Sequence, residues 1–114
     1  MTFARGAVVL VAYPNSDLKT FKKRPAVVVQ NARANTGLAQ IVVALITTNL
    51  SRTGETRVRI NRNSAAGKGM RVFTDSVIVC DVLQTVATRA VLTVIGNCPV
   101  MHEVDSALRA ALDL

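Results

Sequence analysis

The sequence predicts a small, mostly antiparallel β domain that ends in one α-helix. Half of the 114 residues are apolar, and most of these are Val, Ala, Leu and Ile. Branched side chains pack well on a pleated sheet, so this composition favours strands. From Pro99 onward, the apolar side chains recur instead at helical spacing. A chain of this length fits one compact core, so we expect a single domain over residues 1–114.

Apolar runs bounded by turn-forming residues predict three strands in the first half of the chain. These strands are Gly6–Tyr13, Pro25–Gln30 and Ala39–Thr47. The polar and basic segment Pro14–Arg24 is expected to be a loop. Pro25 would then start its strand, where a missing N–H does least harm. Asn35 and Gly37 indicate a turn over residues 31–37.

The second half predicts further strands, with one segment left open. Glu55–Ile60 alternates charged and apolar side chains, so Arg57 and Arg59 face one way and their apolar neighbours the other. Loops are expected at residues 49–54 and 61–69. Two short strand signals lie in Met70–Cys80, around residues 74–75, and Val82–Val86 continues as strand. Residues 87–95 fit a short helix or another strand.

The closing helix has one apolar face and one polar face. Pro99 fits its first position, where the absent N–H of proline is not missed. Its apolar positions are Met101, Val104, Ala107, Leu108, Ala111 and Leu112. We therefore expect the helix to cover one face of the sheet.

The charge is strongly positive and unevenly placed. Fourteen Lys and Arg stand against seven Asp and Glu, for a net charge of +7. Such a balance indicates a polyanionic partner, namely RNA, DNA or an acidic protein segment, although a basic surface also serves solubility. The charges form two clusters, Lys19, Lys22, Lys23 and Arg24 in one segment and Arg52, Arg57, Arg59 and Arg62 in another.

The apolar stretches indicate a cytoplasmic protein. The longest uncharged one, Leu38–Ile46, is far shorter than the about 20 residues that span a bilayer. Residues 1–6 lack the order of charge, apolar block and cleavage site of a signal peptide. We therefore expect no membrane association. Cys80 and Cys98 do not make a disulfide framework, and we expect both to be reduced and partly buried.

The familiar catalytic sets are absent from the sequence. The single histidine, His102, excludes a two-histidine acid–base pair within one chain, and we expect it on the exposed side of the last helix. No Cys–His or Ser–His–Asp arrangement and no metal-ligand spacing stands out, so we expect neither metal nor cofactor. An enzyme here would work by positioning and electrostatics. RNA cleavage suits that limit, because RNA carries its own nucleophile, the 2′-hydroxyl.

Five motifs, taken in order, resemble the MazF/PemK family of toxins. Each motif alone is modest, but their order and spacing over Arg5 to Leu112 are fairly specific. The motifs are Arg5-Gly6 before an apolar strand, the segments 14–18, 23–29 and 44–49, and Asp75–Val79 followed by the closing helix.

This resemblance implies a compact SH3-like barrel with a C-terminal helix, of the PemK/CcdB-like type, that forms a homodimer. Such toxins cleave single-stranded RNA (mRNA, tRNA or rRNA) at short sequences without a metal and leave 2′,3′-cyclic phosphate and 5′-hydroxyl ends. A cognate antitoxin occupies the RNA site. The family's catalytic arginine falls on Arg24 and its catalytic threonine on Thr47.

The chemistry of these two side chains agrees with such roles. The guanidinium fork of Arg24 suits phosphate oxygens, and because it stays protonated we expect charge stabilisation as its main role. The hydroxyl of Thr47, at a strand end, can donate to a phosphate. Without the resemblance, Arg24 would be interpreted as a surface ion-pair residue and Thr47 as an ordinary strand residue.

Further side chains around this pair are expected to bind RNA. Asn15, Ser16 and Asn49 can contact base edges, with Thr48 beside them, and Phe21 is the most plausible platform for a base. Phosphate contacts are expected from Lys19, Lys22, Lys23 and Arg52. Asp75, Ser76 and Asp81 are expected to line the far side of the groove.

The chain departs from the family pattern at three positions. Ala7 and Ala12 stand where acidic residues are common, and Val82 stands where a Gln is common. These differences bear on the RNA sequence that is recognised and on the strength of the activity. Two other functions stay open: a CcdB-like, non-enzymatic poison of DNA gyrase, and a plain RNA-binding module.

Overall fold

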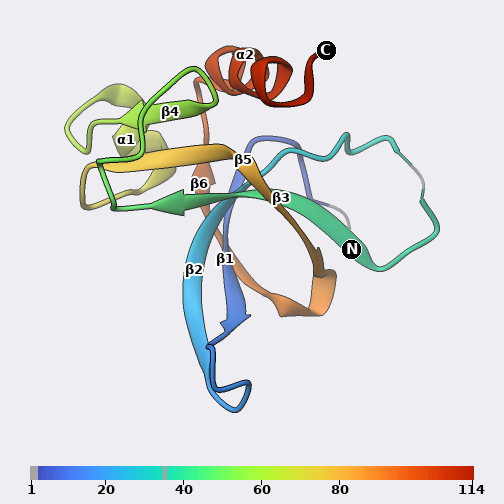
Figure 1. Ribbon diagram of the computed structural model, residues 1–114. Helices are drawn as coiled ribbons and strands as arrows, with labels where there is room; N and C mark the ends of the chain where they lie inside the picture. Colours follow the sequence, from blue (N-terminus) through green and yellow to red (C-terminus); the bar gives the residue numbers. More distant parts are fainter. Residues whose placement is uncertain (1–2, 35) are drawn as a thin grey trace.

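The computed structural model describes residues 3–34 and 36–114, so Met1, Thr2 and the predicted turn residue Asn35 lie outside it. Within that part, the chain folds into one six-stranded antiparallel sheet in the order β4-β5-β3-β2-β1-β6 (Figure 1). The elements are β1 (Ala7–Pro14), β2 (Phe21–Val28), β3 (Gln40–Thr47), β4 (Arg57–Ile60), α1 (Ala65–Met70), β5 (Ser76–Ala87), the 3₁₀ turn η1 (Thr88–Ala90), β6 (Val91–Asn97) and α2 (Met101–Leu112).

The predicted fold class is confirmed. The sheet is mostly β and curls on itself, with the C-terminal helix α2 packed across it (Figure 1). In the described part, the edge strands β4 and β6 do not pair with each other, so the curled sheet stays open. The barrel implied by the family resemblance therefore describes the curl of this sheet and not a closed ring. No helix of the described part is long and apolar enough to cross a membrane.

One face of the sheet, which we call the helix-covered face, packs against both helices. Val104 and Ala107 of α2 are buried there against Ile60 of β4 and Ile78 of β5, and Met70 at the end of α1 is fully buried in the same cluster. The predicted amphipathic pattern of α2 is thus confirmed at its centre, while Leu112 at its end is exposed. This packing fixes the positions of β4 and of the start of β5.

The opposite face, which we call the enclosed face, is buried by the curl of the sheet itself. Val9 and Val11 of β1 meet Ala26 and Val28 of β2 and Val43 of β3 in a second apolar cluster. The second half of β5 and η1 carry the chain back to β6, so side chains from those segments close over this cluster. The two apolar faces follow from strand alternation, because successive side chains point to opposite sides.

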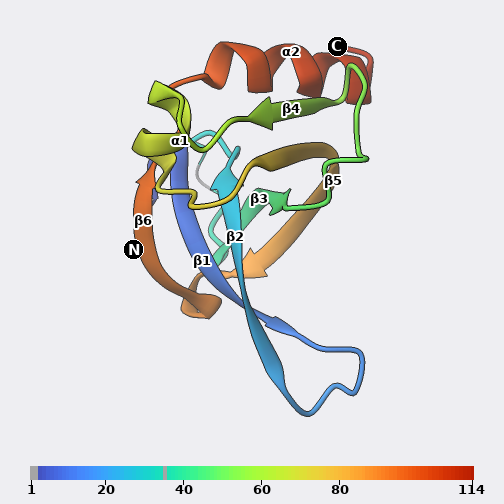
Figure 2. The same cartoon turned by 90° about the vertical axis from the view of Figure 1, so that its left-hand side faces the viewer.

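The predicted loop over residues 14–24 is wrong at its end, because β2 already begins at Phe21. Phe21 to Lys23 pair with Pro14 to Ala12 of β1 and form a two-stranded hairpin that projects from the sheet (Figures 1 and 2). Both faces of this hairpin meet solvent, so its strand lacks the apolar alternation that reveals a strand in the sequence. Pro25 lies inside β2, one residue before the pairing with β3 begins at Ala26.

The predicted loop over residues 61–69 is also wrong, since it contains most of α1. The hydroxyl of Ser64 caps this short helix by accepting the Gly67 N–H, at 3.0 Å. Gly67 lies inside this helix, where close packing requires a glycine: a Cβ there would overlap the carbonyl oxygen of Asn61. Arg71 ends α1 in the left-handed conformation, with φ +60°. The strand signal at residues 70–75 is therefore not realised.

The remaining segments form longer strands than the sequence indicates. β5 runs unbroken from Ser76 to Ala87, and a register shift against β3 falls between Ala44, opposite Leu83, and Leu45, opposite Val79. This irregularity lets one strand serve both parts of the curled sheet. The open segment 87–95 is resolved as η1 followed by strand β6.

Candidate functional site

Strand pairing brings Arg24 and Thr47 to the same side of the sheet. Ala26 of β2 lies opposite Leu45 of β3, and two residues beyond this last pair stand Arg24 on β2 and Thr47 on β3. The pairing of the two strands ends here, because β2 continues into the hairpin with β1 while β3 stays paired with β5. By alternation, both side chains lie on the enclosed face, at its open rim. Figures 1 and 2 show β2 crossing β3 on its way to the hairpin.

The hydroxyl of Thr47 is held by the backbone that follows it. The Asn49 N–H donates to Thr47 Oγ1 at 3.1 Å, which places the threonine oxygen at the turn that ends β3. Because this oxygen accepts, the proton of the hydroxyl is left to donate. Thr47 is half-buried, so its hydroxyl lies at the boundary between the core and solvent.

Arg24 presents a free positive charge at this rim. Its side chain is exposed, opposite Val11 of β1, and in the described residues no carboxylate lies within ion-pair distance of it. Lys22, two residues earlier on the same strand, lies on the same face, opposite Tyr13. A surface ion pair, the ordinary interpretation of Arg24, is thus not what the structure shows.

The hairpin carries five other residues predicted to bind RNA. Its turn is compact: Asn15 Nδ2 donates to Thr20 Oγ1 at 2.9 Å, and the carboxylate of Asp17 accepts the N–H groups of Lys19 and Thr20. The hydrogen bonds from the Thr20 and Lys19 backbones lower the pKa of Asp17. Within the hairpin the structure exposes Ser16, Lys19, Phe21 and Lys23 and leaves Asn15 half-buried.

The loop after β3 carries Thr48, Asn49 and Arg52, all exposed beside Thr47. The side chain of Asn49 bends back on this loop, because its Oδ1 accepts both the N–H and the hydroxyl of Ser51. Its amide nitrogen is the group that remains for a base edge. Thr48 and Arg52 lie at the same end of the sheet, as the sequence interpretation requires.

The three residues expected on the far side of the groove have different surroundings. Ser76 is only 3% exposed and its hydroxyl donates to the Thr74 carbonyl at 2.7 Å, so it braces a turn and offers no surface donor. Asp75 accepts the Arg62 N–H at 2.9 Å. Asp81 pairs with Arg57 at 2.9 Å. Ser76 therefore does not contribute to the candidate surface. The carboxylates of Asp75 and Asp81 already bond to neighbouring arginines.

Arg57 and Arg59 of β4 were not among the predicted site residues, yet the register places them on the face of Thr47. Arg59 lies opposite Val77 of β5, and Val77 lies opposite Thr47 of β3. The alternation in the sequence did show that both arginines share one face. The alternation could not show which strand pairs with β4. That partner is β5, which follows only after α1 and a loop.

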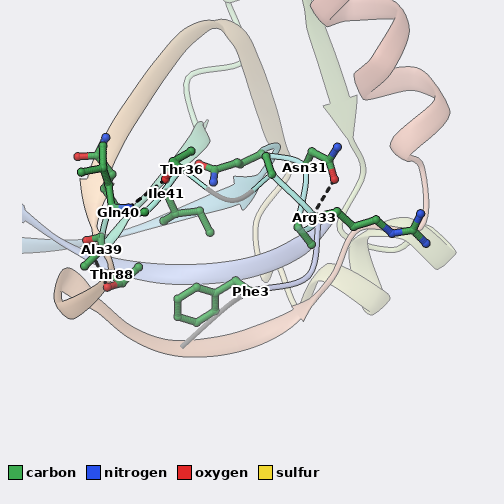
Figure 3. Close-up of a pocket in the computed structure, with 13 residues that line it drawn as sticks. Phe3, Asn31, Arg33, Thr36, Ala39, Gln40, Ile41 and Thr88 are labelled. Carbon is green, nitrogen blue, oxygen red and sulfur yellow. Dashed lines mark hydrogen bonds between the residues drawn. The ribbon is translucent and has the colours of Figure 1, made fainter.

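A separate hollow lies at the other end of β3. Its volume is about 420 Å³, and it opens between the loop of residues 30–40, Phe3 and Thr88 (Figure 3). Arg33 is the only charged residue in its lining. None of the residues predicted to bind RNA lines it. Arg24, Thr47 and the residues predicted to bind RNA thus lie outside this hollow.

The described residues contain no group of three or more His, Cys, Asp or Glu side chains placed to hold a metal ion. His102 is exposed on α2, as predicted. Cys80 and Cys98 are free thiols, as predicted, but are fully rather than partly buried. Burial raises the pKa of Cys80 to about 11 and also raises that of Cys98, so both stay protonated near neutral pH.

The family follows from a match over nearly the whole chain. Residues 4–112 match the profile of the PemK-like, MazF-like toxins of type II toxin-antitoxin systems. The chain belongs to this family. The match covers Arg24, Thr47 and β4 together, so the surface described above lies wholly within the family domain.

Solved structures share the fold at low sequence identity. An endoribonuclease from Mycobacterial species superposes with a TM-score of 0.74 at 22% identity, covering 100% of this chain and 94% of that one. A MazF toxin of Mycobacterium tuberculosis gives 0.72 at 23% identity, covering 95% and 97%. A MazE–MazF complex from Deinococcus radiodurans gives 0.75 at 17% identity, covering 100% and 98%. Among curated proteins nothing matches.

Proposed function

We propose that this protein is an endoribonuclease toxin that cuts single-stranded RNA without a metal ion. The observation that supports it most is the strand pairing that puts Arg24 and Thr47 on the enclosed face, each two residues beyond the last pair of β2 and β3. The arginine is free of carboxylate partners in the described residues, and the threonine oxygen is fixed by a backbone N–H. Structural relatives at similar length include an endoribonuclease.

In this proposal RNA supplies its own nucleophile. The 2′-oxygen bonds to the adjacent phosphorus as the bond to the 5′-oxygen breaks, which leaves a 2′,3′-cyclic phosphate and a 5′-hydroxyl. The 2′-hydroxyl gives its proton to water, and the leaving oxygen receives one. Arg24 stabilises the negative charge that gathers on the phosphate oxygens, and Thr47 donates a hydrogen bond to the same group. Fixed donors of this kind need no rearrangement during the reaction.

The partner of this surface, besides RNA, is an antitoxin. One solved relative is an endoribonuclease in complex with its cognate antitoxin, at 23% identity and a TM-score of 0.72. An acidic segment of such a protein would be attracted to the net charge of +7 and could cover Arg24 and Lys22. We propose that the toxin acts in the cytoplasm as a homodimer and is neutralised in this way.

The test is to incubate the purified protein with a long mixed-sequence RNA in EDTA and to map the cut ends. We expect cuts at a short sequence, with cyclic phosphate on one side and 5′-hydroxyl on the other. Arg24→Ala should lower the rate by about 10²–10³, because it removes one transition-state donor. Arg89→Ala is the matched control, since this exposed arginine lies on η1, at the far end of β5.

Three results would contradict the proposal in different ways. Cleavage that EDTA abolishes would refute the metal-independent mechanism. Cleavage that Arg24→Ala leaves at the wild-type rate would refute the role of Arg24. RNA binding without cleavage, or inhibition of DNA gyrase with RNA left intact, would replace the enzyme by a binding module or by a gyrase poison.

A further inference from the structure

Two exposed residues that the proposed reaction does not use lie on the other side of Thr47 from Arg24. They are Arg59 of β4 and Phe73 in the loop between α1 and β5. We propose that they form a second subsite for the RNA strand, in which Arg59 binds a phosphate and Phe73 stacks on a base. This inference rests on the proposed function, since it takes RNA as the ligand of the Arg24–Thr47 surface.

The position of Arg59 follows from two steps of strand pairing. Arg59 lies opposite Val77, and Val77 lies opposite Thr47, so the three residues form one row across the sheet. Two strand spacings put the backbones of Arg59 and Thr47 about 10 Å apart. Val58 and Ile60 are buried on the helix-covered face, so Arg59 points to the face of Thr47. Neighbouring nucleotides of one extended strand can reach both residues.

Arg59 is also more available than Arg57, the other arginine of its strand. Arg57 donates to Asp81 at 2.9 Å and to the Thr53 carbonyl at 3.1 Å, and its side chain is 27% exposed. Arg59 is 58% exposed and meets Asp75 only at 4.0 Å. A pair this long and this exposed holds the guanidinium weakly. A phosphate oxygen can therefore compete with Asp75 for Arg59.

Phe73 is a large apolar side chain left in solvent on a well-anchored loop. It is 84% exposed. The loop is fixed at one end by Arg71, whose N–H bonds the carbonyls of Gly67 and Lys68, and at the other by Asp75, which accepts the Arg62 N–H. The ring is thus presented from a fixed backbone, which lowers the entropy lost on binding.

The loop of Phe73 opens on the same end of the sheet as Thr47. Phe73 precedes Val77 by four residues, so its backbone lies within about 14 Å of the residue paired with Thr47. Exposed basic residues lie in the chain segment that leads to it: Arg62, Lys68 and Arg71. An exposed ring among cations, beside a phosphate-binding residue, suits a single strand of RNA better than an apolar partner, because bases stack on rings while cations track phosphates.

Phe21 on the hairpin is 68% exposed, but by alternation along β2 it points to the face of Val27 and not to that of Arg24. Phe73 is therefore the ring that this subsite uses. Figure 2 shows the hairpin at the lower right and the loop before β5 at the upper left of the molecule.

The test measures binding apart from cleavage. The probe is a short fluorescent random-sequence RNA with 2′-O-methyl groups, which cannot be cut, and the readout is anisotropy at several salt concentrations. Phe73→Ala should weaken binding about tenfold, because stacking on a ring is sequence-tolerant. Phe73→Tyr should bind like wild type and Phe73→Leu should not. The control is Leu92→Ala, an exposed apolar residue on β6.

Arg59→Ala should lower the slope of log K against log salt by about 0.7, the share of one phosphate on a single strand. Arg89→Ala should leave that slope unchanged. With cleavable RNA, Phe73→Ala and Arg59→Ala should raise KM and leave kcat near wild type, since neither residue touches the scissile phosphate.

The outcomes separate this inference from the proposed function. If the wild-type protein cuts RNA and the Phe73 and Arg59 variants bind as tightly as their controls, the subsite is refuted and the enzyme stands. If the protein binds the probe through Phe73 and Arg59 but cuts no RNA, the subsite stands and the enzyme is refuted. If it binds no RNA at all, both are overturned.

Discussion

The two ends of β3 differ in shape and in chemistry. At the Gln40 end, a hollow of about 420 Å³ opens among mostly neutral side chains of the loop that precedes the strand (Figure 3). At the Thr47 end there is an open basic surface, with Arg24 on the neighbouring strand β2 and Arg59 on β4, beyond β5. None of the residues predicted to bind RNA is among the lining residues described for the end with the hollow.

This difference shows that the shape of a binding surface has to be judged against the size of its ligand. A small molecule is bound by enclosure, but a polymer strand must enter and leave on both sides of the reacting bond. Fixed donors on an open edge suit such a strand, and flanking cations set its path. The two ends also differ in support. Ile46, next to Thr47, is buried in the same apolar cluster as Met70, whereas the loop of residues 31–39 is exposed wherever it is described.

The largest effect is expected from removing that support. Met70 is fully buried, so Met70→Ala should lower the free energy of unfolding by about 2–5 kcal/mol through lost contacts and a cavity. Leu38→Ala, at the other end of β3, should change it by less than about 0.5 kcal/mol, because Leu38 is largely exposed. Urea unfolding followed by circular dichroism measures both. Equal losses would mean that the two ends are equally supported.

A second prediction compares two threonines that make the same local hydrogen bond. Thr47 accepts the N–H of Asn49, and Thr36, beside the hollow, accepts the N–H of Leu38 at 3.2 Å. Thr47→Val should lower the rate of RNA cleavage about 10²-fold, since a donor to the phosphate is lost. Thr36→Val should cut RNA at the wild-type rate. The two variants differ only in position, so similar rates would break the comparison.

A third prediction concerns the path of phosphates along the basic end. Lys22 shares the face of Arg24, and we expect Lys22→Ala to lower the salt slope of RNA binding by about 0.7. Arg33→Ala removes a charge beside the hollow instead and should leave the slope as it is. Binding titrations of a non-cleavable RNA at several salt concentrations decide this. A larger change for Arg33 would move the RNA to the other end of β3.

The smallest effect is on the pH dependence of stability and concerns Cys80, a buried residue of β5. Burial raises its pKa from 9.0 to about 11, so folding favours the protonated thiol. Its contribution to stability is fully present below pH 9 and is lost as the pH rises toward 11. We therefore expect Cys80→Ala to make the free energy of unfolding less dependent on pH between pH 9.0 and about pH 11. An identical dependence in both proteins would show that Cys80 stays neutral in the unfolded chain as well.

Several features were set by local sequence and were predicted from it. The apolar period after Pro99 indicated α2, and the alternation of Arg57 and Arg59 with buried neighbours indicated β4. The ordered motifs pointed to the family and, within it, to Arg24 and Thr47. Prediction from local sequence patterns failed where a contact with another segment of the chain determined the local structure. Gly67 forms part of α1 because it packs on Asn61, and Phe21 is in a strand because it pairs with Pro14.

The sequence by itself determined a mainly β fold with one long helix, a strong positive charge, and a reactive inventory poor in histidine. Only the tertiary structure decided which of these side chains meet. Arg24, Thr47 and Arg59 come from three strands: the pairing of β3 and β4 with β5 sets Arg59 and Thr47 in one row, and the pairing of β2 with β3 puts Arg24 on the same face. Register between distant strands depends on the packing of both sheet faces, so no local pattern contains it.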